Sequence, residues 1–362
     1  TQAVGGTSAL SIGSVTVTGV VLTNNSTDFS VVTALSGTGG LTQGVGATLK
    51  LGGTSGITTL TATANPNTVN YNGAAQTVIA TAYHHLTLSG SGAKTLTSVA
   101  TINGDLTTSG TATATTAIAM AIAGNLTVGS GTTLTVAGFN FTVTGTTSVT
   151  GTLAHSSATG TKTFTGNVTV NNGGTWDNTS ASSAVTMAGN LQNDGTFNAG
   201  TGVYTFSGAA KTISGASAVS IPNLTVTGTV TNSGTLTVST ALSGAGGLTN
   251  TGTLNMTDST ISGNIGNNSS VGGGIFNSGT LTMTGSTVSG NDGAVNIPTI
   301  SQGCDTGSGC RTMSTSAAAF REGSVQSTPT SAQNAGWPTV STGSAPAGYN
   351  GWIVDGNYGN AG

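Results

Sequence analysis

The chain has 362 residues, a formal net charge of −3 and only 4% charged residues, where an ordinary soluble domain carries about 25%. Glu, Lys and Arg, which normally cover helix surfaces, are so scarce that extensive helix is excluded. The six basic residues are dispersed along the chain, and this excludes nucleic acid as a partner because phosphate binding needs clustered cations. No apolar run reaches the roughly 18 residues of a membrane-spanning helix.

The remaining composition indicates β-structure. Glycine accounts for 59 residues, and glycine and asparagine suit turns, while the β-branched threonine and valine pack well on a pleated surface. Chains rich in Gly and Ser can also be disordered. Here 35% of the residues are hydrophobic, and they alternate with threonine in short runs, which favours an ordered β-chain.

Short alternating strands, broken by Gly or Asn, are expected from the start of the chain to about residue 293. In runs such as Leu126-Thr-Val and Leu224-Thr-Val, the apolar side chains face one way and the threonine faces the other. A three-residue strand cannot bury its apolar face alone. Stacking of equivalent strands from successive units would create long parallel sheets around one continuous core.

Internal similarity sets the length of the repeating unit. The signal Gly-Asp/Asn-Leu/Val occurs four times, and its successive intervals correspond to one, two and one periods of about 21 residues. Gly-Thr-Leu also occurs four times, while Ser-Thr-Ile/Val-Ser-Gly-Asn and a longer segment, Thr-Ala-Leu-Ser-Gly-x-Gly-Gly-Leu-Thr, each occur twice. These four signals begin at Gly104, Gly124, Gly166 and Gly189; at Gly151, Gly234, Gly252 and Gly279; at Ser259 and Ser286; and at Thr33 and Thr240.

These patterns predict an all-β fold, a parallel β-helix (β-solenoid) of short Thr/Gly/Asn-rich repeats over residues 1–293. Rungs of about 20 to 27 residues suit two or three strands each, and about 14 rungs at about 4.8 Å would give a rod of nearly 70 Å. Corner asparagines are expected to stack their amides into ladders, and outward threonines to do the same with hydroxyls. The competing fold is an array of antiparallel sandwiches, which needs a larger aromatic core than 4% aromatic residues provide.

Two segments carry a resemblance to known proteins. Residues 65–78, Asn-Pro-Asn-Thr-Val-Asn-Tyr-Asn-Gly-Ala-Ala-Gln-Thr-Val, with Leu-Thr-Leu-Ser-Gly-Ser-Gly-Ala-Lys-Thr-Leu at 86–96, resemble the β-strand-repeat, haemagglutinin-like surface proteins of bacteria. Residues 259–291, with Gly-Gly-Gly-Ile-Phe-Asn in their middle, are similar to repeats of polymorphic outer-membrane proteins. The resemblance spans about 65–291 and implies a right-handed coil and secretion to the cell surface, often within a larger adhesin. The translocating barrel of that class does not follow, so another secretion route or a processed fragment is expected.

The composition changes at about residue 294. Residues 294–362 hold both cysteines, both arginines, the only glutamate and four of the six prolines. Two roles stay open for this segment, a cap over the last rung and a connector to the next subunit. Cys304 and Cys310 enclose a flexible loop that favours a disulfide in an oxidising compartment. Aromatic side chains dominate interface energetics, so the expected assembly contacts are Trp337, Tyr349, Trp352 and Tyr358.

No catalytic, cofactor or metal site is expected. Asp177 and Asp194 lie near one rung, but aspartate is a common turn residue and no arginine accompanies them. His84 and His85 are neighbours, and neighbours on a strand point to opposite faces, so they are not expected to chelate one metal. A polysaccharide-degrading β-helix enzyme would need a carboxylate pair about 5 to 10 Å apart and is the weakest functional alternative.

The sequence therefore predicts an extracellular structural protein without enzymatic activity. It would be the subunit of a cell-surface filament or adhesin rod, assembled head to tail with copies of itself through the solenoid ends and residues 294–362. Host or neighbouring-cell glycans are the other expected partner. The alternative is a glycan- or ice-binding face, because Thr-x-Thr recurs, as at Thr142-Val-Thr and Thr225-Val-Thr. The variable length of the repeats argues against the strict spacing that an ice lattice requires.

Overall fold

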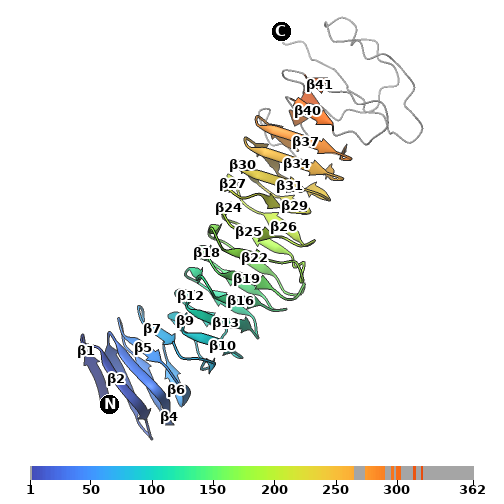
Figure 1. Ribbon diagram of the computed structural model, residues 1–362. Coiled ribbons are helices and arrows are strands. Elements are labelled where there is room, and N and C mark those ends of the chain that lie inside the picture. The colour runs from blue at the N-terminus through green and yellow to red at the C-terminus, as the bar shows by residue number, and fades with distance from the viewer. Residues whose placement is uncertain are drawn as a thin grey trace, which may run out of the picture.

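The fold is an all-β parallel solenoid of about 13 turns, as the strand pattern predicted. Figure 1 shows one elongated rod in which the strands lie across the long axis. At about 4.8 Å per turn, the stack is about 60 Å long. The computed structural model describes residues 2–264 and 274–289, with short strands at 295–296, 299–302, 313–314 and 319–320.

Three sheets run along the rod, so each turn has three strands where the sequence left two or three open. From His85 onwards each turn passes from the 19-stranded sheet to the 13-stranded sheet, then to the 10-stranded sheet and back. The 10-stranded sheet comprises β11 (Thr101–Ile102), β14 (Met120–Ile122), β17 (Phe141–Val143), β20 (Lys162–Phe164), β23 (Val185–Met187), β26 (Val203–Phe206), β29 (Asn223–Val226), β32 (Ala241–Ser243), β35 (Thr260–Ser262) and β38 (Thr287–Ser289).

The 13-stranded sheet is parallel except for its last pair, β40–β41. It comprises β8 (Gln76–Thr77), β10 (Ser91–Leu96), β13 (Thr111–Thr116), β16 (Thr133–Val136), β19 (Thr152–His155), β22 (Thr175–Asp177), β25 (Thr196–Asn198), β28 (Val219–Ser220), β31 (Thr235–Val238), β34 (Thr253–Thr257), β37 (Thr280–Thr284), β40 (Thr299–Gln302) and β41 (Met313–Ser314).

The 19-stranded sheet is parallel except for the pair β39–β42. It also includes the first turns, whose strands are longer: β4 alone pairs with four others, β2, β3, β5 and β6. It comprises β1 (Gln2–Gly6), β2 (Leu10–Thr16), β3 (Val21–Ser26), β4 (Phe29–Gln43), β5 (Thr48–Leu51), β6 (Thr54–Thr61), β7 (Thr68–Tyr71), β9 (His85–Leu88), β12 (Leu106–Thr108), β15 (Leu126–Val128), β18 (Thr147–Val149), β21 (Val168–Val170), β24 (Leu191–Asn193), β27 (Lys211–Ser214), β30 (Thr229–Asn232), β33 (Gly247–Asn250), β36 (Ile275–Asn277), β39 (Val295–Asn296) and β42 (Ala319–Phe320).

The strand register confirms the repeat period. In the 19-stranded sheet Leu106 pairs with Leu126, and Val168 pairs with Leu191, so the partners in each pair are one period apart in sequence. Thr147 occupies the turn between Leu126 and Val168, which explains why the second interval in the sequence is doubled. The Gly-Asp/Asn-Leu/Val signal therefore marks one corner of successive turns.

The core is a continuous column of inward-facing side chains. In three-residue strands such as β15 and β21 the first and third residues are buried and the second is half-buried. A run of aromatic residues fills the middle of the rod, where Trp176 stacks on Phe197 with ring centroids 5.5 Å apart. Offset aromatic pairs of this kind add about 0.5 to 1.5 kcal/mol beyond their buried area.

A column of glycines lets the turns approach closely at the corner before the 19-stranded sheet. A Cβ added to any of the last four would lie 2.2 to 2.6 Å from the carbonyl oxygen of the glycine one turn earlier. Any side chain at these positions would therefore push two turns apart. The column comprises Gly104, Gly124, Gly145, Gly166 and Gly189.

We expect Gly166→Ala to destabilise the solenoid by about 1 to 3 kcal/mol, the usual cost of overpacking. The added methyl would meet Gly145 O, 2.3 Å away. The matched control is Gly56→Ala, because nothing lies within 4 Å of its Cβ position, and it should change stability by less than about 0.5 kcal/mol. Urea unfolding of both variants measures the difference, and equal effects would contradict the close approach.

Candidate functional site

A ladder of side-chain oxygen and nitrogen acceptors follows the glycine column. His85 Nδ1 accepts a hydrogen bond from the Asp105 backbone N–H at 2.9 Å, Asp105 Oδ1 accepts from Asn125 N at 2.7 Å, and Asn125 Oδ1 accepts from Thr146 N at 2.9 Å. Asn167 Oδ1 accepts from Asn190 N in the same way. Each polar corner residue therefore satisfies a backbone donor of the next turn, where no strand partner is available.

A second, buried ladder consists of amides alone, as predicted for corner asparagines. Asn232 Nδ2 donates to Asn250 Oδ1 at 2.7 Å, and Asn250 Nδ2 donates to Asn277 Oδ1 at 2.6 Å. All three side chains are buried. The same Nδ2 atoms also donate to the carbonyl oxygens of Thr253 and Thr280, so the ladder joins three turns without charge.

The predicted hydroxyl ladder is wrong for most of the outward face. Among the described residues, direct bonds between outward hydroxyls of neighbouring turns are few and long, as between Thr225 and Ser243 at 3.4 Å and between Thr16 and Ser36 at 3.3 Å. Neighbouring strands lie about 4.8 Å apart, whereas an O–H···O bond needs about 2.5 to 3.0 Å. The outward hydroxyls are therefore left to solvent or to a partner.

A buried polar network surrounds His155, and it contains a Ser–His pair that resembles nucleophile and base. His155 Nδ1 lies 2.8 Å from Ser183 Oγ, and the Ser183 hydroxyl donates to Asn178 Oδ1 at 2.9 Å. Because the Ser183 hydroxyl proton is used in the bond to Asn178, His155 Nδ1 donates a hydrogen bond to Ser183 Oγ rather than accepting one. Asn178 Nδ2 and Trp176 Nε1 both donate to the Tyr204 hydroxyl.

This network is not arranged for nucleophilic catalysis. His155 and Ser183 are 1% and 0% exposed, so a substrate cannot reach them. Burial, with the nearby Lys162 charge second, lowers the pKa of His155 to about 3, which makes it a weak base. The network instead fixes the six-residue corner from Asn178 to Ser183 over the aromatic core.

Asp177 and Asp194 are not brought together. Asp177 lies in the 13-stranded sheet in register with Asn198, whereas Asp194 follows β24 at a corner of the 19-stranded sheet. Asp177 Oδ1 accepts from the N–H and hydroxyl of Thr179. Bonds from Ala216 N and the Gln192 side chain lower the pKa of Asp194. Asp194 is a turn residue, as expected, whereas Asp177 is the last residue of strand β22.

The two adjacent histidines do not diverge, so that expectation is wrong. Their ring centroids are 4.2 Å apart, because His84 lies in the corner and only His85 belongs to β9. Burial, followed by the neighbouring His85, lowers the pKa of His84. His85 Nδ1 is already used by the corner ladder, and within the described residues no group of three or more His, Cys, Asp or Glu side chains could hold a metal ion.

Two lysines occupy inward positions that the sequence analysis missed. Lys94 Nζ donates to Gly73 O, Ala74 O and Gln76 Oε1 at 2.6 to 2.8 Å. Lys162 Nζ donates to three backbone carbonyls at 2.6 to 3.1 Å. Burial lowers both pKa values, that of Lys94 to about 8. The signal was available, because Lys162-Thr-Phe places the lysine in phase with the inward Phe164.

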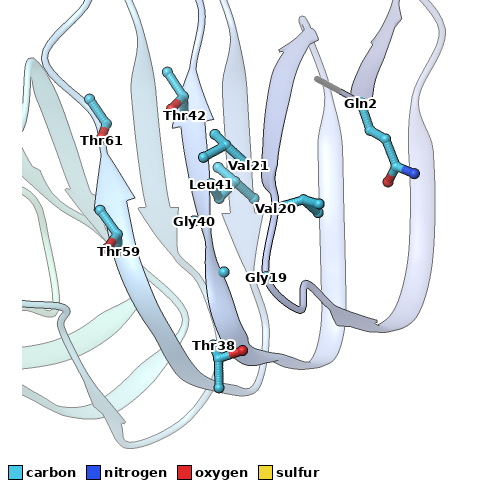
Figure 2. A pocket seen from close by; sticks show the side chains of 11 residues that line it. Gln2, Gly19, Val20, Val21, Thr38, Gly40, Leu41, Thr42, Thr59 and Thr61 are labelled. Carbon is cyan, nitrogen blue, oxygen red and sulfur yellow. The ribbon is translucent and has the colours of Figure 1, made fainter.

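A hollow of about 620 Å³ lies near the N-terminal end of the rod. Figure 2 shows its lining, in which Gly40 lies beside Val21 and Thr59. Val20 and Val21, also in the lining, are about half exposed. The lining is uncharged, and it offers apolar contacts, hydroxyl hydrogen bonds and those of the Gln2 amide.

No family model, curated protein or solved structure matches this chain. The described part of the chain contains no helix able to cross a bilayer. The predicted disulfide, Cys304–Cys310, and the predicted assembly contacts, Trp337, Tyr349, Trp352 and Tyr358, lie outside the described residues.

The stability of the protein should fall between pH 6.5 and 3 because of His155. Its pKa is lowered from 6.5 to about 3 in the fold. Between these two pH values, His155 is protonated in the unfolded chain and neutral in the folded chain. The contribution of neutral His155 to the free energy of unfolding is complete above pH 6.5. As the pH falls below that value, it is lost at about 1.4 kcal/mol per pH unit. Urea midpoints from pH 7 to 4 should show a shallower dependence in His155→Gln, and identical slopes would refute this origin.

Replacing Lys162 should be costly because its three carbonyl acceptors would lose their donor. We expect Lys162→Met to destabilise the fold by about 1 to 3 kcal/mol, the cost of leaving buried polar groups unsatisfied. The matched control is Lys211→Met, where the lysine is only half-buried and the change should stay within about 0.5 kcal/mol. Thermal and urea unfolding compare the two, and a neutral Lys162→Met would contradict the structural role of the ammonium.

Proposed function

We propose that the protein is an extracellular structural protein, the subunit of a cell-surface filament or adhesin rod. The observation that carries this proposal is the uninterrupted parallel stack of about 13 turns, which supplies length and stiffness. The buried polar groups of its described middle serve corners and core, as the contacts of His155 and Lys162 illustrate. A rod of this kind holds something at a distance from a surface.

The interactions that hold the turns together suit an extracellular setting. Only 4% of the residues are charged, and within the described residues Lys50 and Asp28 form an ion pair at 2.9 Å. Backbone ladders, buried amides and apolar side chains are screened little by salt, unlike surface ion pairs. The resemblance of residues 65–291 to haemagglutinin-like and polymorphic outer-membrane repeats supports the same location.

The N-terminal end of the described stack favours end-to-end assembly. Among the described residues, β1 pairs only with β3 and β2 pairs only with β4, and unpaired edges template further strands. Of the seven exposed large hydrophobic residues in the described part of the chain, five lie within residues 10–45. A contact between this end and the opposite end of another copy is heterologous and generates open filaments, with residues 294–362 as the proposed connector.

Electron microscopy of the purified full chain, without crosslinking, tests assembly. We expect filaments with an axial repeat near the length of one rod. Val21→Lys should abolish them, because it places a charge on the exposed aliphatic end, whereas Val203→Lys should not, since Val203 is exposed to a similar degree in the middle of the rod. Isolated rods of about 60 Å at all concentrations would contradict the filament.

A further inference from the structure

The 10-stranded sheet carries an unbroken row of hydroxyl side chains on its outward face. Each member lies at an outward position of its strand and pairs in register with the member of the next turn. The row runs through seven successive turns and contains only threonine and serine. Its members are Thr142, Thr163, Thr186, Thr205, Thr225, Ser243 and Ser262.

A second row lies two residues further along the chain. The backbone N–H of each member donates to a carbonyl of the preceding turn, so this row continues the same ladder. Together the rows form a grid with spacings of about 6.6 Å along the strands and about 4.8 Å between turns. The second row contains four hydroxyl residues and one alanine: Thr144, Thr165, Ala188, Ser207 and Thr227.

Variation in repeat length does not disturb this grid. The sequence interval between successive members of the first row is longest from Thr163 to Thr186 and shortest from Thr225 to Ser243, yet both pairs stay in register. The additional residues lie at corners, as in the six-residue segment from Asn178 to Ser183. The irregular repeat length that argued against a lattice in the sequence therefore has no effect on this face.

Among the described residues, the first row is the longest run of hydroxyl side chains in register. The 13-stranded sheet carries a run of five, Thr113, Thr133, Thr152, Thr175 and Thr196. The 19-stranded sheet carries another run of five, which ends at Gln192: Thr87, Thr107, Thr127, Ser148 and Thr169. The 10-stranded sheet therefore differs from the other two faces in the length of its hydroxyl row, while its remaining outward positions include Val203, Asn223 and Ala241.

The hydroxyls of this face are available to a partner. Within the described residues, no hydrogen bond engages the side chains of the first four members of the row, and the single direct bond along it joins Thr225 to Ser243 at 3.4 Å. The two rows contain no charged and no aromatic side chain. A partner for this face must itself be uncharged, hydrogen-bonding and periodic in two dimensions.

We propose that this grid binds the surface of ice. An ice crystal presents uncharged hydrogen-bonding groups at regular intervals in two dimensions, and threonine, which occupies most points of the grid, offers both a hydroxyl and a methyl group. A soluble glycan fits less well, because sugar-sized ligands are normally held in concave sites with aromatic walls, which these rows lack. The inference concerns one lateral face and does not depend on assembly through the rod ends.

The test compares ice binding of the full chain with that of two matched variants. We expect the unmodified protein to inhibit ice recrystallisation and to produce thermal hysteresis. Thr186→Lys, in the centre of the grid, should lose both activities because a long charged side chain lifts the face from the crystal. Ala154→Lys, at an outward position of the 13-stranded sheet in a row of mixed side chains, should keep them, and circular dichroism verifies that both variants fold.

Two outcomes would overturn the proposal. One is the absence of recrystallisation inhibition and thermal hysteresis in the unmodified chain. The other is an equal loss in Thr186→Lys and Ala154→Lys, which would place the activity away from the grid. Retention on insoluble cellulose or chitin that Thr186→Lys abolishes, in a chain without ice activity, would assign the face to polysaccharide instead.

Discussion

The structure depends on the parallel backbone ladder that runs along the rod axis. Except at the ends of the sheets, each strand lies between equivalent strands of the preceding and following turns, so each inward position repeats down the rod and its side chains form a column. A strand as short as Leu126–Val128 has no stability alone. The ladder makes it one layer of a continuous core, and cohesion then grows with the number of turns rather than with the quality of any single strand.

Hydrogen bonding is hardest to satisfy at the corners, because the backbone there has no strand neighbour. Neutral side chains supply the missing hydrogen bonds. Amide–amide bonds join Asn232, Asn250 and Asn277. Corner side chains such as Asn125 accept hydrogen bonds from backbone N–H groups of the next turn. Where a corner carbonyl cluster needs several donors at once, a lysine is turned inward, as Lys162 shows. The few charges of this chain are thus partly internal, which explains how the fold keeps so little charge on its surface.

The repeating part of the fold could be predicted from the sequence, and its exceptions could not. Gly124-Asn-Leu and the equivalent Gly-Asp/Asn-Leu/Val segments indicate the repeat period. In each of them a glycine in close contact with the next turn, a corner acceptor and an inward apolar residue recur together. Lys162 was misplaced because charge suggested exposure, although its phase with Phe164 indicated the interior. His84 was assigned to a strand that begins one residue later. The network of His155 and Ser183 joins residues 28 positions apart, and no local pattern signals such a contact.

The length of the corners and the spacing of side chains on the faces vary independently, and this has a functional consequence. Turn length varies along the 19-stranded sheet, from the short turn between Asn232 and Asn250 to the long turn between Asn250 and Asn277, yet the strands stay in register. In the turn that leads to Thr186, the additional residues lie in the corner from Asn178 to Ser183. Corner sequences of this kind can vary without altering the spacing of side chains on a face. A lateral surface with a fixed grid can be kept on a rod whose corners and ends serve other contacts, so a structural role and a binding role are compatible in one chain. The hydroxyl row of the 10-stranded sheet, which is longer than the rows on the other two faces, is the feature that such a division of roles would preserve.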